Sequence, residues 1–209
     1  MRVEVMPGLP ADLLDQAWDF YLECFNDLRV LAANRHLLHR DEFDDLMADT
    51  RVPKYVALDA EETVVGLAAM TTELDAISLI APEYFEYHWP ELYRENRIFY
   101  VSFVGADRGT RGAGVFIALL RRMYQPIGEV DGKVVVDICS YNEDRHQLPR
   151  MIAIILGRAA GRAQPTRVDA QSFWLYEFPK AGAPVRKEER RGLVRDRRVS
   201  SSGSERRRV

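Results

Sequence analysis

The sequence predicts a mixed α/β fold with a central sheet flanked by helices, in one domain or at most two small ones. The chain has 209 residues, 47% of them hydrophobic, so it can bury a substantial core. Segments with the alternation of a half-buried strand occur between segments with the three- and four-residue spacing of an amphipathic helix. Two apolar runs at 54–59 and 63–72, joined by a short polar link, indicate an antiparallel hairpin.

The N-terminal part of the chain is predicted to form a strand and two helices. Residues 2–6 alternate between polar and apolar side chains, and a Pro-Gly pair at 7–8 ends this strand. From residue 10 to about residue 32, apolar side chains recur every three or four residues, which predicts a helix with one buried face. Residues 40–48 predict a second, shorter helix of the same kind.

The hairpin is followed by a segment rich in aromatic residues and carboxylates. We expect residues 82–96 to form a helix that breaks near Pro90, because proline removes a backbone hydrogen bond. Beyond it, strands and helices are predicted to alternate to the end of the folded part, over residues 97–104 (strand), 112–124 (helix), 133–139 (strand), 147–161 (helix) and 167–178 (strand).

Charge is distributed unevenly along the chain. Residues 180–209 hold 11 Lys and Arg against 4 Asp and Glu, a net charge of +7, whereas residues 1–179 hold 18 against 28, a net charge of −10. The tail has almost no large apolar residues, so it cannot offset its ordering entropy and we expect it to be disordered. The predicted folded domain is therefore 1–179. No aromatic residue lies between the arginines of the tail, so nucleic acid is not an expected partner.

Several classes of protein are excluded by the sequence pattern. No stretch approaches the ~18 apolar residues of a membrane-spanning helix, so no membrane contact is expected. Cys24 and Cys139 are neither clustered nor flanked by His at ligand spacing, which argues against a disulfide scaffold and a zinc site. His36 and His39 have no metal-binding spacing with nearby carboxylates. We expect a soluble cytoplasmic protein with no metal.

The loop from Asp107 to Gly114 is the strongest functional signal in the sequence. It follows a predicted strand and opens a predicted helix, so its backbone N–H groups and the positive helix terminus could hold a phosphate. Its glycines permit a close approach of that backbone. The loop has neither the Gly-Lys-Ser/Thr ending of an ATP-binding P-loop nor the third glycine of a dinucleotide-binding fingerprint. A glycine-rich turn with a purely structural role is the alternative.

With Gly112 and Gly114 at its glycine positions, this loop resembles the phosphate loop of the GCN5-related N-acetyltransferase (GNAT) superfamily, Gln/Arg-x-x-Gly-x-Gly/Ala. The predicted element order is similar to that of the family over most of residues 1–178. The resemblance implies a GNAT-like fold with a mixed, mostly antiparallel sheet, and acetyl-CoA or another acyl-CoA as co-substrate. Gly109 departs from the pattern, since the family usually has Gln or Arg there, although Arg108 and Arg111 flank it.

The resemblance also implies which residues contact the cofactor. In the family, the strand before the loop pairs through its backbone with the pantetheine arm, whose two amides match the repeat of an extended segment. An ordinary buried strand is the competing interpretation. The implied contacts are Phe103, Val104, Gly105, Arg108, Gly109, Thr110, Arg111, Gly112, Ala113 and Gly114.

Acylation of an amine by direct attack benefits from a base, because removing the proton of a lysine-like amine at pH 7 costs about 4 to 5 kcal/mol. Family members commonly place an Asn at the end of the fifth strand and a Tyr seven residues later as the acid. Asn142 fits the first position, but Pro149 occupies the second. Substitutes in the neighbourhood are Tyr141, His146 and Tyr124, and each of them has an ordinary packing or surface role as its alternative.

Carboxylates after the hairpin supply the candidate bases. Glu73 and Glu83 are the preferred pair, with Asp75 and Glu86 beside them, in segments that would approach the acceptor side of the fold. The alternative is that they are solvated surface acids. Aromatic residues between 84 and 93 would line an apolar pocket or belong to the core.

The sequence therefore predicts an acyltransferase that moves an acetyl or other acyl group from acyl-CoA to the amine of a small molecule. The acidic body favours a cationic acceptor. Two alternatives stay open. One is a synthase of N-acyl amino acids or acyl-homoserine lactones that uses a longer acyl thioester, and the other is a non-catalytic acyl-CoA-binding or interaction module. The oligomeric state, including a homodimer, also stays open.

Overall fold

The computed structural model describes residues 1–78, 80–107, 109, 112–160 and 164–176. The chain divides into a compact unit, Met1–Ala170, and a second unit that begins at Gln171. Residues 171–176, the described part of the second unit, form neither helix nor strand. The tail that the sequence sets apart at residue 180 lies outside the described residues.

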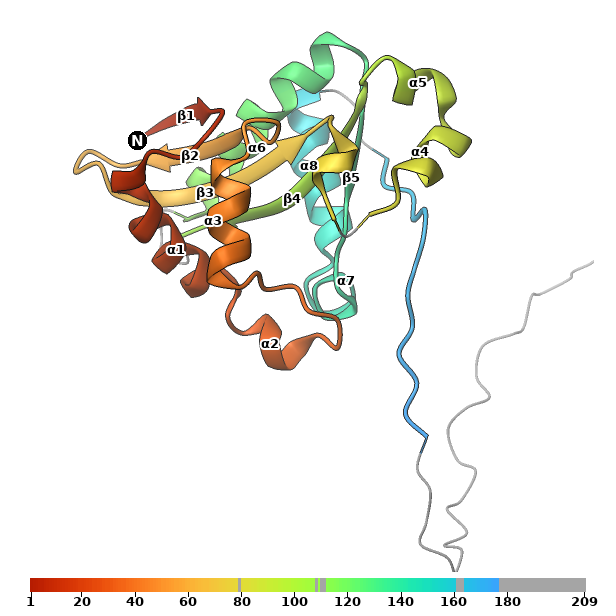
Figure 1. Cartoon of the computed structure of the whole chain (residues 1–209), viewed down its shortest axis with the longest axis horizontal. Helices are drawn as coiled ribbons and strands as arrows, with labels where there is room; N and C mark the ends of the chain where they lie inside the picture. The colour runs from red at the N-terminus through yellow and green to blue at the C-terminus, as the bar shows by residue number, and fades with distance from the viewer. Residues whose placement is uncertain (79, 108, 110–111, 161–163, 177–209) are drawn as a thin grey trace, which may run out of the picture. The chain divides into compact units, whose positions relative to one another are not determined.

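A five-stranded sheet forms the centre of the compact unit (Figure 1). Its strands follow chain order: β1 (Arg2–Met6), β2 (Lys54–Leu58), β3 (Val64–Thr71), β4 (Ile98–Ala106) and β5 (Lys133–Val136). The first four strands pair antiparallel and β5 pairs parallel to β4. The mixed, mostly antiparallel sheet and the hairpin of β2 and β3 confirm the predicted fold class.

Helices cover both faces of the sheet. They are α1 (Ala11–Phe25), α2 (Leu28–Leu31), α3 (Arg40–Ala48), α4 (Pro82–His88), α5 (Pro90–Arg94), α6 (Gly112–Glu129), α7 (Ser140–His146) and α8 (Leu148–Ala160), with a short 3-10 turn at Leu74–Ala76. Figure 1 shows α1 and α3 on one face and α6 and α8 on the other. Every described helix is too short or too polar to cross a membrane.

The alternation of side chains along the strands separates two layers of core. On β3, Leu67 packs with the buried residues under α1 and α3, whereas its neighbour Ala68 packs under α6. Gly66 sets how closely α6 approaches the sheet, because a Cβ atom there would lie 2.6 Å from Val115 Cγ1 and 2.9 Å from Leu119 Cδ1. A glycine at this position therefore permits the close helix–sheet contact.

The structure departs from the sequence prediction at four elements. The helix expected over 10–32 ends at Phe25, and a separate short turn, α2, follows it. The helix expected over 112–124 continues to Glu129 through Pro126, with Ile127 buried on its core face. The strand expected over 133–139 ends at Val136. The single helix expected over 147–161 is α8, and a further helix, α7, precedes it.

The prediction of a final strand over 167–178 is wrong for residues 167–176. Residues 167–176 form no strand, and residues 177–178 lie outside the described part of the chain. Polar–apolar alternation is compatible with a strand, but a strand forms only where its backbone can hydrogen-bond to a neighbouring strand. Without such a partner the alternating pattern is not sufficient.

Candidate functional site

The two parallel strands diverge partway along their length. β5 pairs with β4 only from Ile98 to Val101, opposite Lys133 to Val136. β4 continues to Ala106, so its last residues have no partner on the β5 side among the described strands. Figure 1 shows the two ribbons separating beyond this point. An extended ligand with amide groups could pair with this free edge.

A β-bulge marks the point of divergence. The register of β3 against β4 shifts between Met70, which pairs with Val101, and Ala69, which pairs with Phe103. Ser102 is therefore left without a partner on β3, and its hydroxyl is buried with no hydrogen bond to any described group. A bulge bends the strand that carries it and commonly lies beside a site.

Strand geometry decides which backbone groups reach the free edge. The N–H of Asp107 donates to the carbonyl of Val65 on β3, 2.9 Å away. Consecutive residues of a strand direct their backbone groups to opposite edges. It follows that Val104 and Ala106 direct their N–H and C=O groups away from β3, toward the free edge. The Ala106 carbonyl there also accepts a hydrogen bond from the Cys24 thiol, at 3.7 Å.

The other two predicted contacts on β4 face the opposite way. Phe103 and Gly105 direct their backbone groups toward β3, as the register requires. The Phe103 ring packs edge-on against Tyr21 of α1, with ring centroids 5.1 Å apart. A Cβ atom at Gly105 would lie 3.1 Å from Cys24 Sγ. These two residues thus belong to the packing between β4 and α1.

The glycine loop leads directly into α6. The Asp107 carboxylate accepts a hydrogen bond from the N–H of Gly109 at 3.0 Å, and the N–H of Gly112 donates to the carbonyl of Gly109 at 3.0 Å. Gly112 cannot be replaced without movement, since a Cβ atom would lie 1.7 Å from the carbonyl oxygen of Asp107. A Cβ atom at Gly114 would meet no other atom within 4 Å.

The first turn of α6 is accessible. Ala113 and Gly114 are exposed, and the first N–H groups of a helix have no partner within the helix. The predicted contacts Arg108, Thr110 and Arg111 lie outside the described residues. An exposed, positive helix terminus after a free strand edge is an arrangement that suits an anion.

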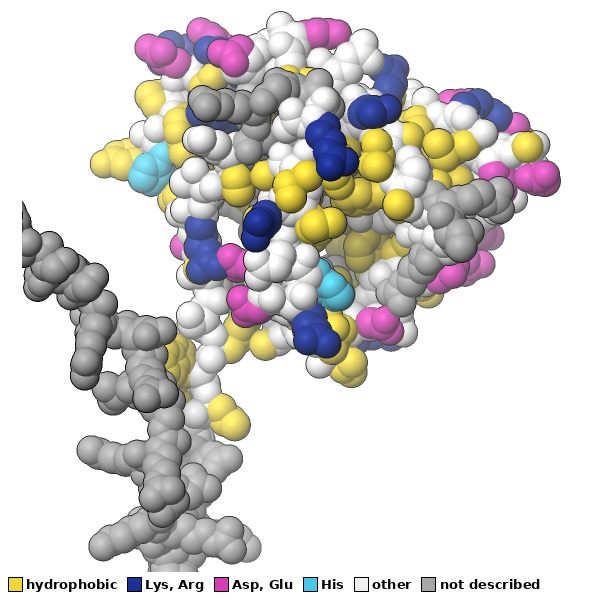
Figure 2. Space-filling model, turned by 180° about the vertical axis from the view of Figure 1, so that it is seen from behind, with side chains coloured by type: hydrophobic (Ala, Val, Ile, Leu, Met, Phe, Trp, Pro, Cys, Tyr) yellow, Lys and Arg dark blue, Asp and Glu magenta, His cyan; other side chains and the backbone are white. Residues whose placement is uncertain are grey.

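The back of the molecule, where α6 and α8 lie, has a mixed surface. Figure 2 shows apolar side chains gathered near the middle of this face, with Lys and Arg side chains around and among them. Among the exposed apolar side chains of α8 are Met151 and Ile154. A surface that combines apolar contact with positive charge can take a ligand of the same mixed character.

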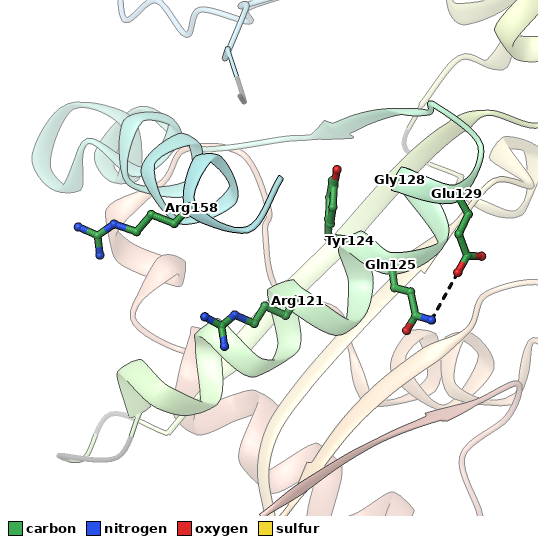
Figure 3. Close-up of a pocket in the computed structure, with 6 residues that line it drawn as sticks. All are labelled: Arg121, Tyr124, Gln125, Gly128, Glu129 and Arg158. Carbon is green, nitrogen blue, oxygen red and sulfur yellow. Dashed lines mark hydrogen bonds between the residues drawn. The ribbon is translucent and has the colours of Figure 1, made fainter. Parts of the chain in front are cut away.

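A surface cavity of about 750 Å³ lies between α6 and α8. It is lined by Arg121, Tyr124, Gln125, Gly128, Glu129 and Arg158. Figure 3 shows that Arg121 and Arg158 extend in the same direction, one from each helix. Gln125 and Glu129 are joined by a hydrogen bond of 3.4 Å. The Tyr124 ring rises from α6 beside Gly128, where a Cβ atom would lie 3.2 Å from its Cζ, so the cavity combines a ring with two guanidinium groups.

The predicted catalytic residues lie on three different elements, and no hydrogen bond among the described residues joins their side chains across these elements. Glu73 precedes the 3-10 turn and Glu83 lies on α4, and both side chains are exposed without a hydrogen bond to a described side chain. Tyr141 and Asn142 lie on α7, where Tyr141 packs edge-on against His146 at 5.3 Å. Asn142 is thus in a helix rather than at the end of β5. Pro149 lies in the first turn of α8, which suits proline.

A cluster of three polar residues that sequence reasoning missed lies where β4 and β5 diverge. The Tyr100 hydroxyl donates to Asp137 Oδ1 at 2.8 Å, and His36 Nδ1 lies 3.5 Å from Asp137 Oδ2. The Tyr100 residue is 4% exposed, and the His36 and Asp137 side chains are 16% and 51% exposed. We call Tyr100, Asp137 and His36 the polar triad.

The polar triad has defined protonation states at neutral pH. Burial, together with the charge of Asp137, raises the pKa of Tyr100 above its ordinary range. The pKa of Asp137 is lowered overall. Partial burial of the carboxyl raises this pKa, but the hydrogen bonds from His36 and Tyr100 lower it by more. Tyr100 is therefore a neutral phenol and Asp137 a carboxylate.

A second cavity adjoins the triad. It has a volume of about 400 Å³ and is formed by α2 and the segment after it, with His36, Arg29, Arg35 and His39 among its lining residues. Arg35 is paired with Glu42 through two hydrogen bonds. Among the described residues, no group of three or more His, Cys, Asp or Glu side chains is arranged to hold a metal ion.

Comparisons with known proteins add a likeness of fold. The sequence matches no protein-family profile and no curated protein. A solved structure of the tetramutant of the BH1408 protein from Bacillus halodurans is similar with a TM-score of 0.50 at 12% identity, over 85% of this chain and 100% of that chain. A probable acetyltransferase has a TM-score of 0.49 at 14% identity, over 86% and 97%.

The aminoglycoside antibiotic 6'-N-acetyltransferase AAC(6')-Ih from Acinetobacter baumannii has a TM-score of 0.47 at 10% identity, over 84% of this chain and 100% of that chain. Two of these three solved structures are thus named as acetyltransferases. At these identities the likeness concerns the fold alone.

Proposed function

We propose that this protein, which has the GNAT-like fold, moves an acetyl or other acyl group from an acyl-CoA thioester to the amine of a small molecule. The observation that carries the proposal is the free edge of β4 beyond Val101, which leads through the glycine loop into the exposed N-terminus of α6. One elongated ligand with amides at one end and phosphates at the other matches both features.

The free edge would hold the pantetheine arm. Val104 and Ala106 direct donors and acceptors to this edge, and two residues along a strand match the spacing of an extended chain with amides. The thioester end of the arm would then lie near Ser102, where the strands diverge. The buried hydroxyl of Ser102 is the polar side chain closest in sequence to that position.

The first turn of α6 would bind the pyrophosphate. The N–H of Gly109 donates to the Asp107 carboxylate and the N–H of Gly112 to the Gly109 carbonyl, so among the described residues of the loop and its helix start, Ala113 and Gly114 offer N–H groups to a phosphate. The positive end of the helix dipole adds attraction. Gly114 contributes by leaving open the space that a side chain would fill.

The cavity between α6 and α8 would hold the nucleotide end. Arg121 and Arg158 supply two positive charges, and Tyr124 supplies a ring against which a base can pack. Exposed arginines contribute a screened attraction, so this part of the site would add less affinity than the loop.

A non-catalytic acyl-CoA-binding module is the second candidate, and one observation favours it. The position at which the family commonly has a catalytic tyrosine is Pro149, in the first turn of α8. Binding of CoA without transfer would separate this candidate from the enzyme.

Titration calorimetry with CoA tests the binding site, and release of free thiol from acetyl-CoA with a panel of amines tests transfer. Gly114→Asp should weaken CoA binding at least a hundredfold. The new carboxylate repels the phosphate, which would then lose about two charge-assisted hydrogen bonds, each worth about 1.5 to 3 kcal/mol. Gly114→Asn, equal in size but uncharged, is the matched control and should lose less. A parent protein that binds no CoA or other acyl thioester would refute the proposal.

A further inference from the structure

We infer that His36 is the general base that deprotonates the acceptor amine, and that Asp137 and Tyr100 position it. The inference rests on the proposed acyl transfer and adds to it the residue that performs the proton transfer. It replaces Glu73 and Glu83, which are exposed and have no hydrogen bond to a described side chain, as the source of the base.

The contacts of the polar triad favour this role. His36 Nδ1 faces Asp137 Oδ2 at 3.5 Å, so a proton on Nδ1 is directed at the carboxylate and Nε2 is left as the proton acceptor. The second carboxylate oxygen accepts a hydrogen bond from the Tyr100 hydroxyl at 2.8 Å. Tyr100 is almost fully buried in β4 and therefore fixes the carboxylate to the sheet. A base oriented by a third group is the arrangement that proton-transfer sites share.

The position of the triad agrees with the proposed path of the thioester. Asp137 directly follows Val136, the last residue of β5 that pairs with β4, and Val136 pairs with Val101. The carboxylate thus lies beside the bulge at Ser102, where the thioester end of a pantetheine arm on Val104 and Ala106 would arrive. The triad and the start of the proposed cofactor edge therefore both lie where the pairing of β4 and β5 ends.

The cavity lined by His36 gives the acceptor its own entrance. It is formed by α2 and the segment after it, and its volume of about 400 Å³ is within the range that holds small molecules. The charged and titratable groups that face His36 or line this cavity are Asp137, Tyr100, Arg29, Arg35 and His39. Arg35 is neutralised by Glu42, and Asp137 is the carboxylate in contact with the ring.

The two protons that the acceptor ammonium loses are taken up by His36 and by the CoA thiolate, so no further reactant is needed. Nε2 of His36 takes one proton from the acceptor ammonium, and the neutral nitrogen attacks the thioester carbonyl carbon. The C–N bond forms and the C–S bond breaks. The CoA thiolate takes the second proton that the nitrogen loses, and the imidazolium returns its proton to solvent. The products are an amide and the free thiol of CoA.

A merely structural role is the competing explanation, since the contact between His36 and Asp137 also ties the segment after α2 to the end of β5. The test therefore uses full-length parent, His36→Gln, His36→Ala, Asp137→Asn and Tyr100→Phe. For each variant, CoA affinity is measured by calorimetry, the fold by circular dichroism, and kcat and KM by thiol release between pH 5.5 and 9. His88→Gln, a histidine exposed on α4, is the matched control.

The expected result is a loss of kcat of about 10²- to 10⁴-fold in His36→Gln at unchanged CoA affinity, together with loss of the acidic limb of the pH profile. Asp137→Asn should lower kcat less than His36→Gln does, at unchanged CoA affinity, because the ring loses the carboxylate that orients it. Tyr100→Phe should show a smaller change, and added imidazole should restore part of the rate to His36→Ala. His88→Gln should match the parent.

Each contrary outcome has one meaning. A His36→Gln variant that keeps the parental kcat and pH profile overturns the inference while the acyltransferase function stands. A parent that binds CoA but acylates no amine overturns the inference and supports the binding module. A parent that does not bind CoA or another acyl thioester overturns the proposed function, and the inference with it.

Discussion

The side-chain ammonium of Lys54 donates a hydrogen bond to the carbonyl oxygen of Pro7 at 3.0 Å and is fully buried at the start of β2. A second hydrogen bond runs from the same nitrogen to the carbonyl oxygen of Asp49, at 2.5 Å. Lys54 thereby joins the ends of β1 and α3 to the sheet. Burial lowers the pKa of Lys54 to about 8, because a charged group loses hydration there.

Stability should therefore rise with pH in the alkaline range. Above pH 8 the folded chain releases the Lys54 proton, whereas the unfolded chain keeps it up to about pH 10.5, so the unfolded state binds more protons and the free energy of unfolding increases. We expect a gain of roughly 1.5 kcal/mol between pH 8 and pH 9.5 from this residue. Urea unfolding at both pH values measures it.

Lys54→Met is the control for that measurement. The variant should lack the gain, and the difference between parent and variant isolates Lys54 from other titrating groups. Measurements stay below pH 10 because burial raises the pKa values of Tyr21 and Tyr55. Above pH 10 the unfolded chain releases these tyrosine protons first, so their contribution makes the free energy of unfolding fall as pH rises. Equal slopes in parent and variant would show that the buried ammonium does not titrate in this range.

A pair of glycine substitutions should have opposite effects on stability. Gly66→Ala places a methyl group 2.6 Å from Val115 Cγ1, so α6 must move and we expect a loss of about 1 to 3 kcal/mol. Gly157→Ala lies within α8, where the added atom meets nothing within 4 Å, and should gain about 0.5 to 1 kcal/mol from helix propensity. Thermal unfolding of both variants measures these changes in stability. A Gly66→Ala variant as stable as the parent would show that α6 does not pack this closely on the sheet.

Most of the helices and strands follow from patterns within one segment, and for this reason they could be predicted. The helix at 40–48 was predicted with both of its ends, and the break near Pro90 appears between α4 and α5. The bulge at Ser102 and the early end of β5 depend on pairing between strands, which a single-sequence pattern does not record.

One part of the candidate site could be predicted from the sequence and another part could not, for the same reason. The glycine loop could be found because all its residues are consecutive. The polar triad could not, since Tyr100 and Asp137 are 37 residues apart and His36 comes from a third segment. The one local signal was a carboxylate directly after a strand, at Asp137, and the expected strand over 133–139 placed that residue inside the sheet instead.

Removal of the basic tail should leave the fold intact. Residues 180–209 contain almost no large apolar side chains and carry a net charge of +7, so they offer little surface for packing. A chain that ends at Pro179 should have nearly the same melting temperature as the full chain. A fall of many degrees would show instead that the tail contributes to the folded protein.

Gly112 should be needed for the conformation of the loop. In Gly112→Ala the new methyl group would lie 1.7 Å from the carbonyl oxygen of Asp107, so the backbone between them must shift. CoA affinity should fall at least tenfold, because the donors of α6 would leave their positions. Gly114→Ala adds the same methyl group in open space and is the control. Equal affinities in the two variants would argue against a binding role for the loop.

The two arginines between α6 and α8 should contribute to CoA binding in a way that depends on salt. Arg121→Ala and Arg158→Ala each remove one exposed charge from the cavity, and such contacts are worth about 0.2 to 1 kcal/mol, so each variant should bind CoA up to about fivefold more weakly. Salt screens exposed charges, so the difference from the parent should shrink between about 0.05 M and 0.5 M NaCl. Arg94→Ala on α5 is a control for net charge, because it removes an equal charge outside the cavity. Calorimetric titration at the two salt concentrations measures all four proteins. If Arg94→Ala weakens binding as much as the other two, the effect belongs to the overall charge of the chain, and the nucleotide end of CoA does not occupy this cavity.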